Sequence, residues 1–151
     1  MKKIIFSTAI VLMLFGTAFA NRPGSDTRNA VASFQKDFKS ASDVSWAESN
    51  RYILATFRLD KQTLYAYYDF RGNLLCLVHH LLTTGLPDDL QKEIKADYSS
   101  YWVTELVKVN TEDGEYYFIQ LNNADESIIL STEGASGWHR YSRLKKNTDN
   151  F

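Results

Sequence analysis

Histidine and cysteine are the side chains with which this sequence could hold a metal, and it contains three histidines and one cysteine. His79 and His80 are adjacent, and neighbouring residues of a strand point to opposite faces, so the two do not readily chelate one ion together. A strand needs the spacing His-x-His for that, and the sequence has none. His139 could approach one of them across a sheet, but no carboxylate partner is identified. We therefore predict no metal site and no cofactor.

Motifs for nucleophilic or phosphate chemistry are also lacking. No serine stands in a Gly-x-Ser-x-Gly elbow, and there is no glycine-rich phosphate loop. Cys76 alternates with Leu74 and Val78, which favours a buried small hydrophobic residue; the alternative is a disulfide between two copies. The paired acids Asp88-Asp89 and Glu112-Asp113 are explained by a helix start and a turn. The sequence therefore predicts a protein that is not an enzyme.

The first twenty residues are typical of an export signal. Lys2 and Lys3 form a basic start, Ile4–Phe15 is apolar, and Ala18-Phe19-Ala20 is a small-x-small cleavage site. The apolar stretch is shorter than the roughly 20 residues that a membrane-spanning helix needs. We predict cleavage after Ala20 and a periplasmic or secreted protein.

Removal of residues 1–20 leaves 131 of the 151 residues, enough for one domain. It also removes two of the 17 basic residues and none of the 18 acidic ones, so the formal charge changes from −1 to −3. A mildly acidic chain argues against nucleic acid or an anionic membrane as partner, because these call for a basic patch.

Two amphipathic helices are predicted, each with apolar residues four apart on one face. The first begins at Ser25, Asp26 or Thr27 and runs to about Ala41, and the second opens at Leu86-Pro87-Asp88-Asp89. The two ladders are Ala30, Phe34, Phe38 and Leu90, Ile94, Tyr98.

After each helix the apolar period changes to two, which indicates strands. The predicted strands are Val44–Trp46, Tyr52–Leu59, Leu64–Phe70, Leu74–Leu82, Trp102–Val109, Glu115–Asn122, Ser127–Thr132 and Gly137–Leu144. The pattern predicts one α+β domain over residues 29–144, made of two helix-plus-meander repeats at about 29–82 and 84–144. We expect one curved antiparallel sheet of about eight strands with both helices on one face. Residues 21–28 form a leader and 145–151 a tail.

The strand registers of the two repeats agree. Ile53, Ala55 and Phe57 correspond to Tyr117, Ile119 and Leu121, and the opposite face of Tyr52, Leu54 and Thr56 corresponds to Tyr116, Phe118 and Gln120. If the helices cover the first face, the other carries aromatic and polar side chains typical of binding surfaces. This candidate binding face consists of Tyr52, Arg58, Tyr65, Tyr67, Tyr116, Phe118 and Gln120. Structural packing or self-association of the same tyrosines is the competing interpretation.

A resemblance to a known family rests on core aromatics, a hairpin glycine and a Leu-Pro helix start. The residues are Phe34, Phe38, Val44-Ser45-Trp46, Tyr52–Phe57, Tyr67-Tyr68-Asp69, Gly72 and Leu86-Pro87. Over residues 29–143 the chain resembles the exported PepSY-like family, which is similar in fold to the bacterial β-lactamase-inhibitor protein. The resemblance implies a Gram-negative periplasmic or secreted protein. The wider group is thought to bind or inhibit peptidases, and the inhibitor binds a protein through its sheet face.

The sequence therefore predicts a non-enzymatic binding module, of which a peptidase or protein inhibitor is one form. Its partner is a protein or peptide held on the candidate binding face, and a homodimer through that face is the structural alternative. From another functional class, the alternative is a periplasmic protein that binds a metal or small ligand through His79, His80 or His139.

Overall fold

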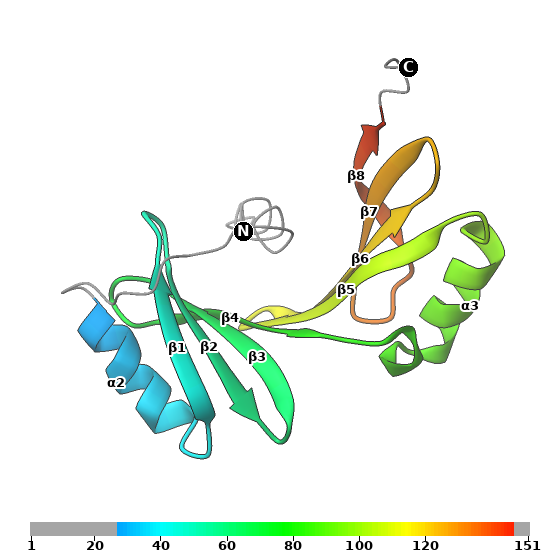
Figure 1. Ribbon diagram of the computed structural model, residues 1–151. Helices are drawn as coiled ribbons and strands as arrows, with labels where there is room; N and C mark the ends of the chain where they lie inside the picture. Colours follow the sequence, from blue (N-terminus) through cyan, green and yellow to red (C-terminus); the bar gives the residue numbers. More distant parts are fainter. Residues whose placement is uncertain (1–26, 147–151) are drawn as a thin grey trace.

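The computed structural model describes residues 27–146 as two helices and one eight-stranded antiparallel sheet (Figure 1). The predicted signal peptide, its cleavage site, most of the predicted leader and residues 147–151 of the tail lie outside the described residues. In chain order the elements are α2 (Arg28–Asp37), β1 (Ser42–Glu48), β2 (Ile53–Leu59), β3 (Gln62–Tyr68), β4 (Leu74–His80), the 3-10 turn η2 (Thr83–Gly85), α3 (Asp88–Asp97), β5 (Trp102–Thr111), β6 (Gly114–Asn122), β7 (Glu126–Glu133) and β8 (His139–Lys145).

The sheet is a continuous meander in which every strand pairs with its neighbours in the sequence. Each of the eight predicted strands agrees with the observed one to within two residues at either end. A helix followed by four strands occurs twice, and β4 pairs with β5 to join the two halves into one sheet. The α+β class and the eight-stranded antiparallel sheet are thus confirmed.

Helix α2 is shorter than predicted, because the expected run to about Ala41 ends at Asp37. At Phe38 the backbone leaves the helical region, with φ −122° and ψ 57°, while its N–H still bonds the carbonyl of Phe34. The Phe38 ring nevertheless lies 4.8 Å from that of Phe57. The four-residue spacing therefore identified a core residue correctly but extended the helix past its end.

The turn between β2 and β3 is also tighter than predicted. Asp60 and Lys61 have φ values of 49° and 68°, which are the left-handed angles of a two-residue hairpin turn. Gln62 and Thr63, predicted as part of the turn, therefore belong to β3. The strand ends at Tyr68, since the following Asp69 accepts backbone N–H bonds in the next turn.

Strand register places both helices on the same face of the sheet, as predicted. Through successive cross-strand pairs, Ala55 on β2 is in line with Leu77 on β4 and Asn110 on β5. Leu106 shares the face of Asn110, because the two are four residues apart on β5. Ala55 packs in the cluster under α2, and Leu106 packs in the cluster under α3.

The helix side of the sheet has two separate cores. The ring of Phe34 on α2 meets those of Phe57 at 4.8 Å and Trp46 at 5.3 Å, both nearly edge-on. Under α3 the buried Trp138 donates its indole N–H to the carbonyl oxygen of Leu90 at 3.1 Å. Each helix thus buries its apolar ladder on its own half of the sheet.

The sheet bends where the two halves meet at β4 and β5, and the helices lie on the outer side of the bend (Figure 1). The inner face is called the helix-free face below. Neither helix of the described residues is layered on it.

Candidate functional site

The helix-free face carries one apolar cluster that crosses the junction between the two halves. Its buried members are Tyr52, Leu54, Tyr67, Cys76, Val78, Val107, Val109 and Phe118. The cluster is continuous across the junction because β4 pairs with β5, where Val78 lies opposite Val109 and His80 lies opposite Val107. The two helix-side cores remain separate, so this face is the apolar surface that both halves share.

Three predicted face residues form the centre of this cluster. Tyr52, Tyr67 and Phe118 are each only 4% exposed, and the rings of Tyr52 and Tyr67 lie 5.1 Å apart in an edge-on contact. All three residues therefore lie together on the helix-free face, as the alternation of the strand sequences indicated. Their burial differs from the open aromatic surface that the sequence led us to expect.

Tyr65 and Tyr116 are the half-buried aromatic residues of the predicted set. Tyr65 pairs with Val78, Val78 with Val109, and Val109 with Tyr116, so the two tyrosines stand in one row across the junction. The phenol pKa of Tyr116 is raised by burial. Val78 and Val109 lie between Tyr65 and Tyr116, so this row consists of two apolar side chains with a tyrosine ring at each end.

Arg58 on β2 and Gln120 on β6 lie on the same face of the sheet. An exposed ion pair joins the Arg58 guanidinium to the Asp43 carboxylate at 3.8 Å, and such surface pairs contribute little to stability. The side-chain amide of Gln120 donates to the Ser127 hydroxyl at 3.1 Å. Both side chains thus add polar atoms to the border of the apolar cluster.

Register also brings residues to this face that the sequence did not single out. Trp102, Asn122, Ser127 and Leu144 form one cross-strand row, in which Trp102 is 52% and Leu144 is 69% exposed. The Tyr141 ring lies 5.8 Å from that of Phe118. Irregular registers at Val103/Glu105 and at Ile129/Leu130 place Trp102 and Tyr141 there. A strict two-residue alternation cannot locate such bulges.

The titratable groups at the centre of the face are held neutral. Burial raises the pKa of the Cys76 thiol to about 12, and burial also raises the pKa of the Tyr67 phenol. Cys76 is 2% exposed, as predicted for a small buried residue. A neutral buried thiol is a poor nucleophile, so the centre of the face offers apolar contact and no activated group.

The three histidines occupy different environments. His80 shares the helix-free face with Tyr65, their rings 5.3 Å apart, and its Nδ1 bonds the Glu105 carboxylate. His79 points to the helix side, where burial lowers its pKa. His139 lies in the row of His80 but four strands further on, roughly 19 Å away at the usual strand spacing. Within residues 27–146 no three potential metal ligands come together.

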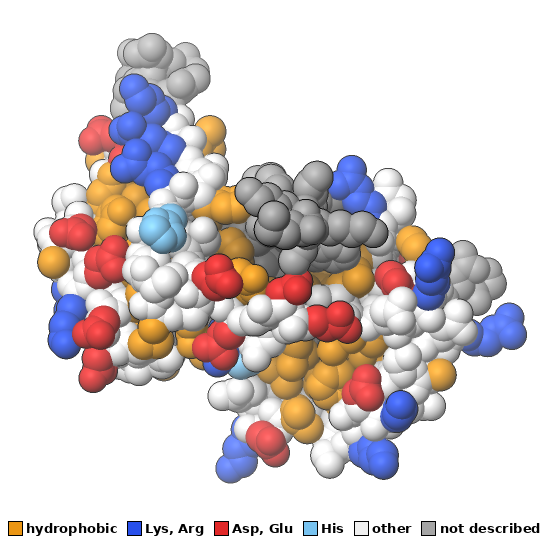
Figure 2. Space-filling view, turned by 180° about the vertical axis from the view of Figure 1, so that it is seen from behind, with side chains coloured by type: hydrophobic (Ala, Val, Ile, Leu, Met, Phe, Trp, Pro, Cys, Tyr) orange, Lys and Arg blue, Asp and Glu red, His pale blue; other side chains and the backbone are white. Residues whose placement is uncertain are grey.

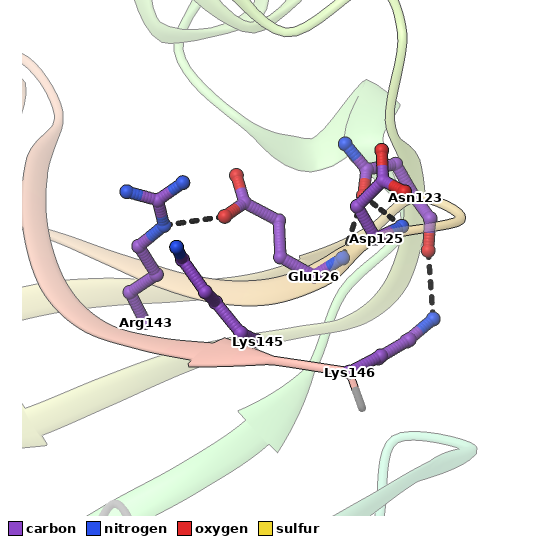
Figure 3. A pocket seen from close by; sticks show the side chains of 6 residues that line it. All are labelled: Asn123, Asp125, Glu126, Arg143, Lys145 and Lys146. Atoms are coloured by element: carbon purple, nitrogen blue, oxygen red, sulfur yellow. Dashed lines mark hydrogen bonds and ion pairs between the residues drawn. The ribbon is translucent and has the colours of Figure 1, made fainter. Parts of the chain in front are cut away.

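A small charged pocket of about 370 Å³ lies at the end of β8 (Figure 3). Its lining is Asn123, Asp125, Glu126, Arg143, Lys145 and Lys146. Glu126 accepts bonds from the Tyr101 hydroxyl and the Arg143 guanidinium, and these contacts lower its pKa. The Lys146 ammonium bonds the Asn123 carbonyl at 2.7 Å. The bond from Lys146 joins the loop at Asn123 to the end of β8. Lys145 has no ion pair within the described part of the chain.

None of the described helices is both long and apolar enough to cross a membrane. No protein-family model matches the sequence. No curated protein matches it either.

Solved structures do match. A BLIP-like protein from Bacteroides fragilis has a TM-score of 0.71 and 16% identity, covering 86% of this chain and 93% of its own. A DUF2874 family protein from Bacteroides uniformis has a TM-score of 0.70 and 13% identity, covering 85% and 94%. A candidate periplasmic protein from Bacteroides eggerthii has a TM-score of 0.69 and 10% identity, covering 78% and 87%. These similarities confirm the expected fold, that of a BLIP-like protein.

Proposed function

We propose that this protein is a non-enzymatic periplasmic binding module that holds a protein or peptide on its helix-free face. The observation that carries the proposal is the apolar cluster that runs across both halves of the sheet, on which neither helix of residues 27–146 is layered. A sheet face this apolar normally packs against a second layer, which a partner can supply.

The face has the residue types that contribute most to protein interfaces. Tyr65 and Tyr116 are half-buried rings with polar tips, and Trp102 is half exposed on the same side. Arg58 and Gln120 add charged and amide groups at the border. Aromatic rings surrounded by polar groups are the usual arrangement of a binding hot spot. In this proposal Tyr52, Tyr67 and Phe118 form the floor beneath the contact residues.

The location and family belong to the same proposal. The basic, apolar and small-residue segments of residues 1–20 favour export, and one solved structure with this fold is described as a candidate periplasmic protein. Membership of the PepSY-like family is supported by the motif residues Phe34, Trp46, Gly72 and Leu86-Pro87. That membership would make a peptidase a natural partner, with inhibition as one outcome of binding.

Site-specific photo-crosslinking in the native host tests the face. A photoreactive residue at Tyr116 should capture a discrete partner, and the matched residue at Lys95, exposed on α3, should not. Tyr65→Ala, in the same row but outside the crosslinking position, should reduce the captured species several-fold while the far-ultraviolet circular dichroism is retained. Equal capture from Lys95, or capture that Tyr65→Ala leaves unchanged, would contradict the proposal. A crosslinked band that contains only this chain would support self-association instead.

A further inference from the structure

Strand β8 is the last strand of the sheet, and its outer edge pairs with no other strand of the described residues. It covers His139–Lys145, and the neighbouring β7 lies on its inner side only. A free edge presents backbone N–H and C=O groups that another extended chain can bond.

One hydrogen bond shows which backbone N–H and C=O groups of β8 point away from β7. The Lys146 N–H donates to the Asp125 carbonyl at 2.7 Å, so the backbone of Lys146 points toward the β7 side. In antiparallel strands this direction alternates from residue to residue. The register is regular from Ser142 to Lys145, so the N–H and C=O groups of Arg143 and Lys145 point away from β7. These two residues can therefore bond an added strand without losing any bond to β7.

The side chains along this edge are mainly basic on one face. Arg140 lies opposite Leu130 and Arg143 opposite Ile128, both buried under α3, and Lys145 lies opposite Glu126. Because cross-strand partners share a face, all three basic side chains lie on the helix side of β8. All three residues are exposed, and Figure 2 shows basic side chains gathered at this end of the molecule.

The basic groups are not all neutralised within the chain. Arg143 bonds Glu126, whereas Arg140 and Lys145 form no ion pair in the part of the chain that the structure describes. On the other side of the strand, Leu144 is 69% exposed. The edge thus offers positive charge on one face, an apolar side chain on the other, and open backbone groups between them.

We propose that β8 binds an acidic extended peptide segment, which adds to the sheet as a ninth strand. Acidic residues at alternate positions of the segment would face Arg140 and Lys145, and apolar residues between them would pack beside Leu144. The backbone bonds would supply affinity, and the charges would select the sequence. Two copies of β8 would repel each other, because like charges would stand opposite one another. Of the groups in this site only Leu144 lies on the helix-free face, so each proposal can fail alone.

A seven-residue peptide that alternates glutamate and valine, blocked at both ends and carrying a fluorophore, is the probe. Binding to the purified protein is followed by fluorescence anisotropy. We expect saturable binding that is lost for a lysine–valine peptide of the same length. A glutamate–valine peptide methylated on alternate backbone nitrogens should bind weakly when the methyl groups face β8, because they remove the donors that strand addition requires.

Two substitutions of Lys145 separate the contribution of its side-chain charge to binding from that of its backbone N–H. Lys145→Gln removes the charge, while Lys145→Pro also removes the outward N–H without touching the β7 ladder. We expect Lys145→Gln to weaken binding, and Lys145→Pro to weaken it by about a further fivefold to tenfold, as expected for one net hydrogen bond. Lys95→Gln on α3, equally a loss of one exposed positive charge, should leave binding unchanged.

Three results would overturn the proposal. The first is no saturable binding of the glutamate–valine peptide. The second is equal binding of the methylated and unmethylated peptides, which means that charge alone attracts the probe, as it would attract any polyanion. The third is a concentration-dependent dimer, seen by sedimentation, that Lys145→Pro abolishes, which would make a second copy the occupant. If Lys145→Pro does not fold, the methylated peptide with unaltered protein decides the question.

Discussion

Replacement of Gly72 by alanine should destabilise the protein strongly, because two separate obstacles meet at this turn between β3 and β4. The residue has φ +90°, a conformation that side chains disfavour by about 1–2 kcal/mol. A Cβ there would lie 2.7 Å from the carbonyl oxygen and 2.8 Å from the carbonyl carbon of Asn29, in the first turn of α2. These are backbone atoms, so helix or turn must shift, as in an overpacked core, at about 1–3 kcal/mol more.

Gly134, between β7 and β8, provides the matched control. It has φ +58°, and a Cβ there would meet nothing within 4 Å. Gly134→Ala should therefore cost only the left-handed backbone term of about 1–2 kcal/mol. The expected cost of Gly72→Ala is about 2–5 kcal/mol, and the difference between the two variants isolates the contact with α2.

Urea unfolding of the two variants and the unaltered protein, followed by circular dichroism, measures both free energies of unfolding. The slope against urea should stay the same, so that a shifted midpoint reports stability alone. Two variants equal within about 0.5 kcal/mol, the scale of ordinary surface effects, would refute the inference that α2 packs tightly on this turn. Thermal unfolding should rank the variants in the same order.

Three further predictions concern buried groups. Cys76 should resist a thiol reagent at pH 8 in the folded protein and react on unfolding, since burial raises its pKa to about 12. Glu126→Gln should make the free energy of unfolding fall less steeply as the pH is lowered. The pKa of Glu126 in the folded protein lies below its ordinary value of 4.5. The stability that this carboxylate contributes is therefore complete above pH 4.5 and is lost as the pH falls through the folded pKa. Trp138→Phe should lower the free energy of unfolding in urea by about 1–3 kcal/mol, through loss of its bond to the Leu90 carbonyl and of ring packing. Reaction of Cys76 in the folded protein would contradict the first prediction. An unchanged dependence of stability on pH in Glu126→Gln would contradict the second, and an unchanged urea midpoint in Trp138→Phe would contradict the third.

The elements and their faces could be predicted because they follow from local geometry. Side chains repeat every 3.6 residues on a helix and every two on a strand, so the spacing of Phe34 and Phe38 and the alternation of Ile53, Ala55 and Phe57 indicate which side each residue occupies. The structure places these residues in one core. Errors arose where the period was broken, as at the two-residue turn of Asp60 and Lys61.

The candidate site was predictable only in part. Alternation correctly placed Tyr52, Tyr65, Tyr67, Tyr116 and Phe118 on one face. It could not indicate their exposure, because burial depends on how neighbouring strands and the bend of the sheet surround each ring. Bulges also change the phase of the alternation, so the sequence pattern missed the positions of Trp102 and Tyr141.

The sequence by itself determined that this chain forms helices and meanders with one apolar and one aromatic strand face, since both properties depend on the order of side chains along a segment. Only the tertiary structure decided which residues meet from distant segments. It joined Glu126 to Tyr101 and Arg143, and it turned the backbone groups of Arg143 and Lys145 toward an edge that pairs with no other strand among the described residues. Such contacts depend on strand order, register and sheet curvature, which act over distances that no local pattern spans.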